Sequence, residues 1–128
     1  MSLDNGVYRV LPAVEHVELA VETFRMLADV TRVQVLWALL DGELSVNELA
    51  EVVGKPAASV SQHLAKLRLA RLVTTRRQGT KVFYRLQDTH VRHLVIDAVH
   101  SAEHAGLDTP QHHRGDAVTV LPTRTQAQ

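Results

Sequence analysis

Apolar residues recur at helical spacing through the first third of the chain. Between residues 13 and 28 they alternate every three and four positions, at Val14, Val17, Val21, Phe24 and Ala28. Acidic residues occupy the opposite side, so this spacing predicts an amphipathic helix. A second helix is expected over Thr31–Leu40. Its apolar residues lie on more than one side, which predicts a core helix that ends at Asp41-Gly42.

A pair of short helices is predicted next. Ser45 and Glu48 have the spacing of a capping box, which indicates a helix that begins after Ser45. Gly54 is suited to end that helix, and Pro56 suits the first turn of another that runs to about Ala70. Two short helices joined by a tight glycine turn are typical of a helix-turn-helix, although any helical hairpin gives the same pattern.

A basic β-hairpin follows, with strands at Val73–Gln78 and Lys81–Leu86, and a last helix is expected over Asp88–Ala105. The predicted fold class is mainly α with a small β-hairpin, that is, a winged helix-turn-helix. Residues 13–105 are expected to form this domain. Residues 1–12 are predicted to be an N-terminal arm and residues 106–128 a flexible C-terminal tail.

Composition narrows the function classes. The 128 residues suit one domain, and their net charge of zero argues against a protein that coats nucleic acid or membranes non-specifically. The absence of cysteine excludes disulfides, thiolate metal sites and cysteine nucleophiles. No apolar run approaches the roughly 18 residues of a membrane span, and no signal peptide is recognised, so a cytoplasmic protein without a membrane partner is expected.

Charge is unevenly distributed along the chain. Residues 1–54 carry a net charge of −6, whereas residues 55–85 carry eight basic residues and no acidic one. A segment of this kind is typical of a surface that binds a polyanion, although a solvated basic face gives the same count. Since this segment spans the predicted second helix of the motif and the hairpin, double-stranded DNA is the expected partner. The candidate DNA contacts are Ser59, Ser61, Gln62, His63, Lys66, Arg68, Arg76, Arg77 and Lys81.

Histidine is unusually frequent near the C-terminus, where six of the eight histidines lie between His90 and His113. At about 100° per residue, four histidines and a carboxylate of the last helix share one arc of about 80°. They are His90, His93, Asp97, His100 and His104. An apolar stripe lies beside this arc and is suited to pack on the same helix of a second chain. Imidazole and carboxylate groups at such a seam predict a metal site with nitrogen and oxygen ligands.

Other interpretations remain open. A single histidine on a helix surface is commonly only polar, Asp97 suits a surface ion pair, and His112-His113 suits an exposed tail. A winged-helix regulator with a non-metal signal, or with none, is the first alternative. A metalloenzyme is the second, but no nucleophile motif and no general base beside an open metal position are recognised, so an enzyme is not expected.

Over about residues 15–105 the sequence resembles the ArsR/SmtB family of metal-responsive repressors. The resemblance rests on Phe24–Asp29 followed by Thr31-Arg32, and on Leu44–Ala50, Ser59–Leu64 and Arg77–Leu86. It implies a homodimer joined through the first and last helices. It also implies that the dimer binds operator DNA without metal and releases it when metal binds.

The resemblance also bears on the effector. The family's thiolate site is absent, because Ser45 and Asn47 stand where it needs cysteines. Its last-helix zinc site is incomplete: Asp88, His90 and His104 match, but the remaining position is Ser101. Without the thiolate site, sensing of soft metals such as arsenite, lead or cadmium loses its support.

A closer resemblance is to the KmtR-type nickel/cobalt sensors of actinobacteria, a subgroup of this family. It covers residues 33–37, 54–57, 94–99 and 102–106 and the tail segment 112–114. It implies Ni(II) or Co(II) as effector, with Zn(II) as the alternative. The implied ligands are His90, Glu103, His104, His112 and His113. Glu103 falls outside the histidine arc, so either the helix ends before Glu103 or Glu103 does not bind the metal directly. Asp88, His93 and His100 are reserve ligands.

Overall fold

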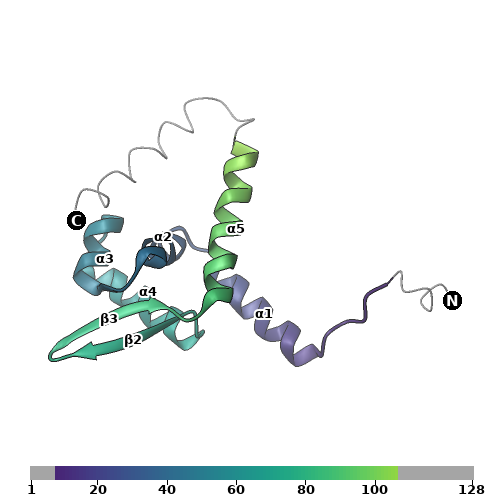
Figure 1. Cartoon of the computed structure of the whole chain (residues 1–128), viewed down its shortest axis with the longest axis horizontal. Helices are drawn as coiled ribbons and strands as arrows, with labels where there is room; N and C mark the ends of the chain where they lie inside the picture. Colours follow the sequence, from purple (N-terminus) through teal and green to yellow (C-terminus); the bar gives the residue numbers. More distant parts are fainter. Residues whose placement is uncertain (1–7, 107–128) are drawn as a thin grey trace.

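A computed structural model describes residues 8–106, and its elements follow one another as Figure 1 shows. They are α1 (Val14–Leu27), α2 (Val30–Ala38), the 3₁₀ turn η2 (Leu39–Asp41), β1 (Leu44–Ser45), α3 (Val46–Val53), α4 (Ala57–Leu69), β2 (Val73–Gln78), β3 (Lys81–Leu86) and α5 (Thr89–Gly106). The pair α3–α4 followed by the β2–β3 hairpin confirms the predicted winged helix-turn-helix. The first seven residues and most of the predicted tail, including His112 and His113, lie outside the described residues.

The core lies between α2, α3 and α4 and is closed by β2 and α5. Leu36 of α2, Leu49 of α3 and Leu64 of α4 are completely buried, and Val95 contributes from α5. Leu36, Leu49 and Leu64 are inward positions of the helical pattern, so the periodicity of the sequence indicated them. The result is that α4 is fixed to the core by one side and keeps its other side available. Val95 belongs to the apolar stripe of the last helix that was expected to pack on a second chain, and together with Val91 it is buried in the core of its own chain instead.

The sheet has three strands rather than the two predicted. The additional strand, β1, pairs antiparallel with β3, so that Leu44 lies opposite Tyr84 and the strand order is β1-β3-β2. Two residues are too few for alternation to be visible in a sequence. Ser45 ends this strand and also caps α3: its hydroxyl oxygen accepts from the Glu48 amide, and the Glu48 carboxylate accepts from the Ser45 amide.

Several helix boundaries differ by one or two residues from those predicted. The α-helical part of α2 ends at Ala38, because the chain tightens there into a 3₁₀ turn. Pro56 is the residue before α4 rather than part of its first turn. Asp88 precedes α5, and its carboxylate accepts a hydrogen bond from the Val91 amide at 3.0 Å, as an N-cap does.

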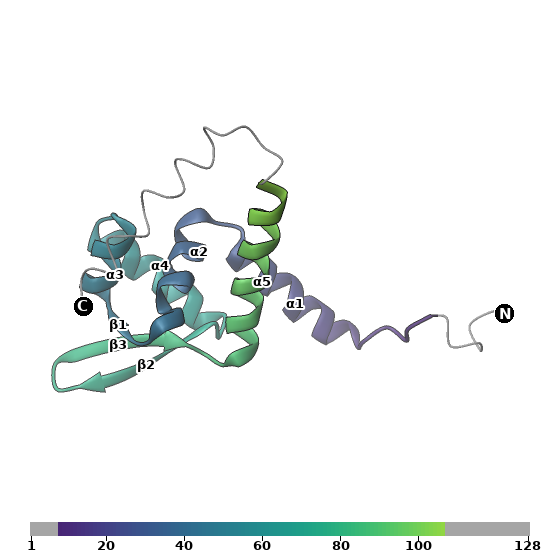
Figure 2. The ribbon, with the colours of Figure 1, turned by 45° about the horizontal axis from the view of Figure 1, so that its top comes forward.

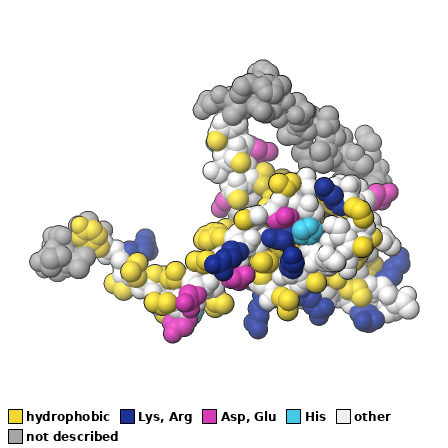
Figure 3. Space-filling model, turned by 180° about the vertical axis from the view of Figure 1, so that it is seen from behind, with side chains coloured by type: hydrophobic (Ala, Val, Ile, Leu, Met, Phe, Trp, Pro, Cys, Tyr) yellow, Lys and Arg dark blue, Asp and Glu magenta, His cyan; other side chains and the backbone are white. Residues whose placement is uncertain are grey.

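Helix α1 projects from the body of the molecule and has no buried residue (Figures 1 and 2). Its apolar stripe is exposed, and Val14, Leu19 and Phe24 each have at least 60% of their surface accessible. Figure 3 shows hydrophobic side chains along the projecting helix. The amphipathic helix is therefore present as predicted, but the described chain provides nothing that covers its apolar face.

Asp29 caps α2, and its loss is expected to lower stability. Its carboxylate accepts from the Arg32 amide at 2.9 Å, and this hydrogen bond lowers the pKa of Asp29. Asp29→Ala should cost about 1 kcal/mol in the free energy of unfolding at neutral pH, whereas Asp29→Asn should cost less, since asparagine also caps helices. A lowered pKa stabilises the fold above about pH 4, and this contribution is lost as the pH falls through the folded-state pKa. Urea unfolding at pH 7 and pH 3 measures both effects. Equal losses for the two variants at pH 7 would contradict the capping role.

Candidate nucleic-acid interface and metal-binding helix

The outer face of α4 is polar and accessible. Val60, Leu64 and Leu67 are buried on its inner side and fix the helix to the core. The exposed candidate contacts on α4 are Ser61, Gln62, Lys66 and Arg68, while Ser59 is half-buried. A helix held in this way, with short polar side chains at its N-terminal half and cations further along, is suited to enter the major groove of DNA.

His63 is less exposed to solvent than the sequence indicated. Its ring lies 3.4 Å from Arg32 Nη1 and 3.9 Å from Asp29 Oδ2, and only 21% of its side chain is accessible. The Arg32 guanidinium also donates to the Met26 carbonyl through Nε at 2.7 Å. These contacts connect the end of α1 and the start of α2 to α4. His63 was expected to face DNA, but it also contacts Arg32 and Asp29, which its position on the helix did not reveal.

The hairpin has two different faces, and Arg76 lies on the outer one. Arg76 stands opposite Phe83 in the ladder, and its guanidinium carbon lies 5.0 Å from the centre of that ring. Its Nε and Nη2 contact the Glu43 carboxylate at 2.8 Å, while Nη1 donates to Gln78 at 3.1 Å. The hydrogen bond from Arg76 lowers the pKa of Glu43, so this carboxylate is ionised at neutral pH. Arg76, predicted as a DNA contact, is thus already paired.

Arg77 lies on the opposite face of the hairpin. In the antiparallel register Arg77 pairs with Val82 and Thr75 with Tyr84, so Arg77 and Tyr84 share a face. Tyr84 in turn lines a hollow of about 600 Å³ against α4. The residues around this hollow are Ser61, Ala65, Arg68, Leu69, Arg71 and Tyr84. The face of the hairpin that carries Arg77 is therefore the one turned toward α4. Figure 3 shows several Lys and Arg side chains along the lower edge of the molecule.

All five polar residues of the predicted arc lie on α5 and are exposed. Between residues 8 and 106, however, no three His, Asp or Glu side chains come close enough to hold one metal ion. At 1.5 Å per residue, His90 and His104 lie about 21 Å apart along one helix, so these two histidines of one chain cannot share an ion. The donor chemistry fits a metal that prefers nitrogen and oxygen ligands. A complete site needs donors from a second α5 or from residues beyond Gly106.

Glu103 is part of the helix, because α5 continues to Gly106. It therefore stays about 100° from His104 and outside the histidine arc of its own chain. The structure removes one of the two explanations that the sequence left open, namely that the helix ends before Glu103. If Glu103 is a ligand, the metal ion must lie at the edge of the histidine arc of α5.

His100 contacts the core through Trp37. The centres of the two rings are 6.3 Å apart, and the rings meet edge to face. Trp37 in turn packs against the buried core. Trp37 is the only tryptophan in the sequence. The histidine side of α5 is therefore in direct contact with α2, the helix on which α3 and α4 pack.

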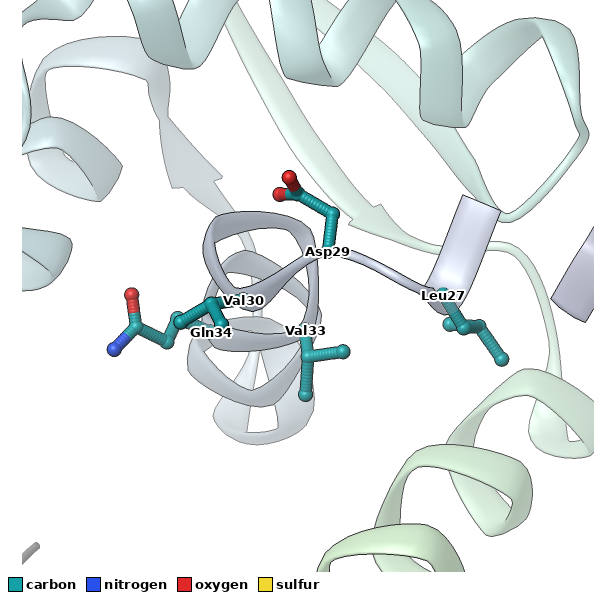
Figure 4. Close-up of a pocket in the computed structure, with 5 residues that line it drawn as sticks. All are labelled: Leu27, Asp29, Val30, Val33 and Gln34. Carbon is teal, nitrogen blue, oxygen red and sulfur yellow. The ribbon is translucent and has the colours of Figure 1, made fainter. Parts of the chain in front are cut away.

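A second hollow lies where α1 meets α2 (Figure 4). It is open, has a volume of about 340 Å³, and is lined by Leu27, Asp29, Val30, Val33 and Gln34. Its exposed lining is almost entirely apolar, and Figure 4 shows the Asp29 carboxylate directed away from Leu27 and Val33. This hollow continues the apolar surface of α1, and the single carboxylate that lines it, Asp29, is not enough to hold a metal ion.

No helix among residues 8–106 is both long enough and apolar enough to cross a membrane.

The sequence matches the model of the arsR family of bacterial regulatory proteins over residues 29–75. The HTH-type transcriptional regulator KmtR of Mycobacterium tuberculosis is 73% identical over 100 residues, which are 78% of this chain and 77% of that protein. The HTH-type transcriptional repressor SmtB of the same species is 40% identical over 97 residues, covering 76% of this chain and 70% of SmtB.

The fold is also similar to a solved structure. The homodimeric winged helix-turn-helix DNA-binding domain of Mb0332 from Mycobacterium bovis superposes with a TM-score of 0.67 at 26% identity. The match covers 76% of this chain and 90% of that domain.

Proposed function

Because this chain belongs to the ArsR family of bacterial regulatory proteins, we propose that it is a metal-responsive repressor. It binds operator DNA as a homodimer and releases the DNA when Ni(II) or Co(II) binds. The family consists of transcription regulators rather than enzymes, and such a protein acts in the cytoplasm, where the chromosome lies. The observation that carries the proposal is the row of exposed histidines on α5, which contacts α2 beneath the DNA-reading helix.

A second copy of the chain is expected to pack against α1. The exposed apolar stripe of α1 needs a partner. On α5, Val91 and Val95 of the predicted stripe are buried in the chain's own core, so its remaining members are the half-buried Leu94 and the exposed Ala98 and Ala102. A two-fold axis between two α5 helices would cover both surfaces and place the two α4 helices on one side. The homodimeric state of the Mb0332 domain supports this arrangement.

Operator binding is assigned to α4 and the hairpin. Ser59, Ser61 and Gln62 lie in the N-terminal half of α4, where side chains of a recognition helix reach base edges. The cations supply contacts to phosphates, which give affinity and salt dependence rather than sequence information. They are Lys66, Arg68, Arg77 and Lys81. His63 and Arg76 remain candidates, but their protein contacts reduce what they can offer to DNA.

Two neighbouring arginines of β2 are expected to differ in their effect on DNA binding. Arg77→Gln should weaken binding and reduce the slope of log affinity against log salt by about one per protomer, since it removes one phosphate contact. Arg76→Gln should leave the slope nearly unchanged, because Arg76 is paired with Glu43. Fluorescence anisotropy with a labelled duplex at several salt concentrations measures both variants. An equal or larger change for Arg76→Gln would contradict the assignment of the two faces.

The metal site is proposed at the seam of the dimer. His90 of one chain would approach His104 of the other when two α5 helices run antiparallel. Glu103, His112 and His113 would complete a set of nitrogen and oxygen ligands, with Asp88, His93 and His100 in reserve. Five such ligands suit Ni(II) or Co(II) better than four-coordinate Zn(II). Asp88 is the weakest candidate, since its carboxylate already caps α5.

Metal binding and DNA binding are expected to be coupled through α5. Ligands from two chains would fix the two α5 helices relative to each other. The contact of His100 with Trp37 connects α5 to α2. The spacing of the two α4 helices would then change. Such coupling is reciprocal, so operator DNA should lower the affinity for metal by the same factor.

A Co(II) titration of the metal-free protein, followed by optical absorption, tests this proposal. A saturable and weakly absorbing spectrum is expected from five or six nitrogen and oxygen ligands. An intense visible spectrum would indicate four ligands and favour a zinc-responsive repressor. No saturable binding would overturn the metal proposal and leave a winged-helix regulator with a different signal.

A further inference from the structure

Arg71 holds a backbone conformation that normally belongs to glycine. Its φ is +62°, and no other non-glycine residue among those described has a positive φ. It follows α4 in a Schellman motif: the Leu72 amide donates to the Leu67 carbonyl at 2.9 Å, and the Arg71 amide donates to the Arg68 carbonyl at 3.0 Å. Glycine is the usual residue at this position because a Cβ is strained there. The arginine therefore makes the end of α4 less stable than glycine would.

The side chain of Arg71 lines the hollow between α4 and the hairpin. Arg68 lines it as well, together with the hydroxyl-bearing Ser61 and Tyr84, and no carboxylate takes part. Neither guanidinium forms a hydrogen bond or an ion pair with another side chain within residues 8–106. Ala65 and Leu69 add an apolar surface, and Leu69 is 86% exposed. The hollow thus presents two unpaired cations beside apolar groups.

The chemistry of this hollow matches one nucleotide unit of a DNA backbone. A phosphodiester is an anion with oxygens that accept from guanidinium groups, and the C–H groups of the adjoining deoxyribose can contact apolar side chains. The hollow begins at Ser61, on the DNA-reading side of α4, and ends at the turn that carries Arg71. A strand whose bases face Gln62 would run its backbone along this side of α4.

We propose that Arg71, together with Arg68, binds a backbone phosphate of DNA in this hollow. The proposal rests on the DNA binding proposed above, and it adds a contact at the C-terminal end of α4. It also gives a reason for the strained arginine, because residues held in unfavourable backbone conformations are concentrated at functional sites.

Arg71→Gly tests the proposal, because stability and DNA binding are expected to change in opposite directions. Removing the Cβ should raise the midpoint of thermal unfolding by a few degrees, about 4 °C for a small domain. Removing the guanidinium should lower the slope of log affinity against log salt by about 0.9 per chain, and the affinity at low salt should fall by about tenfold. Since phosphate contacts are independent of sequence, a labelled 30-bp duplex of arbitrary sequence is a sufficient probe.

Arg71→Lys is the matched control, since it keeps the charge and the strained backbone. It should leave the unfolding midpoint unchanged and retain most of the salt slope. Wild-type affinity and slope in Arg71→Gly, or a loss in Arg71→Lys as large as that in Arg71→Gly, would overturn the proposal. Failure of the proposed function is distinguishable, because the wild-type protein itself would then show no salt-dependent binding to the duplex.

Discussion

Replacing either His90 or His104 by alanine is expected to lower the affinity for Ni(II) or Co(II) by at least about 100-fold. Changes in groups that merely orient ligands already cost about 10- to 100-fold, and these histidines are assigned as ligands. Both are exposed on α5 and contribute nothing to the buried core, so folding and metal-free DNA binding should persist. The two single variants should be equally impaired if each site takes one of these histidines from each chain.

Mixing the two variants tests whether the site is shared between chains. A heterodimer of His90→Ala and His104→Ala has one site that lacks both histidines and one site that is intact. Random exchange should therefore restore about a quarter of the sites, measured as bound Co(II) after refolding the mixture. His16→Ala, a change of an exposed histidine on α1, is the control and should bind like the wild type. Full metal affinity in either single variant would contradict the ligand assignment, and no recovery on mixing would contradict the shared site.

Leu64→Ala is expected to lower the free energy of unfolding by about 2–5 kcal/mol, as large-to-small changes in cores do. Leu64 is completely buried and fixes α4 to the core. Its loss would also leave the DNA-reading helix less firmly held, so operator affinity should fall in parallel with stability.

Leu69→Ala is the matched control for this variant. It makes the same chemical change on the same helix, five residues later, where the side chain is 86% exposed. Its effect on unfolding should stay within about 0.5 kcal/mol. Urea denaturation of both variants is the measurement, and similar losses would contradict the assignment of the inner and outer sides of α4.

The sequence predicts the elements in which apolar residues repeat regularly over several turns, or which carry a strong local signal such as a capping box. The helices follow the spacing of their apolar residues, and the capping box of Ser45 and Glu48 forms as predicted. Both strands of the hairpin begin and end at the predicted residues. The strand β1 was missed, because its two residues carry no pattern and depend on the partner strand β3.

The candidate site was less predictable than the fold, because side-chain partners come from distant parts of the chain. Strand alternation places Arg76 and Arg77 on opposite faces, but the sequence does not show that the face of Arg76 meets Glu43. The position of His63 depends on Arg32, thirty-one residues away. Arg71 and Tyr84 were not among the predicted contacts. An arginine directly after a helix, where glycine is usual, was the signal for Arg71.

The metal ligands remain predictions for a related reason. A linear pattern places histidines on one side of α5, but it does not supply the second chain that a site needs. His112 and His113 lie outside the described residues, and the described donors of one chain do not gather into a site. The assignment therefore depends on the seam between two chains, which the experiments above address.

Metal and operator DNA are expected to weaken each other's binding to this protein. The most direct test is fluorescence anisotropy of a labelled duplex, selected by the wild-type protein from a random-sequence pool, with and without saturating Ni(II) or Co(II). We expect metal to weaken binding by at least about fivefold, the lower end of typical allosteric coupling, and His90→Ala to remove this effect. Equal affinity with and without saturating metal would contradict the account.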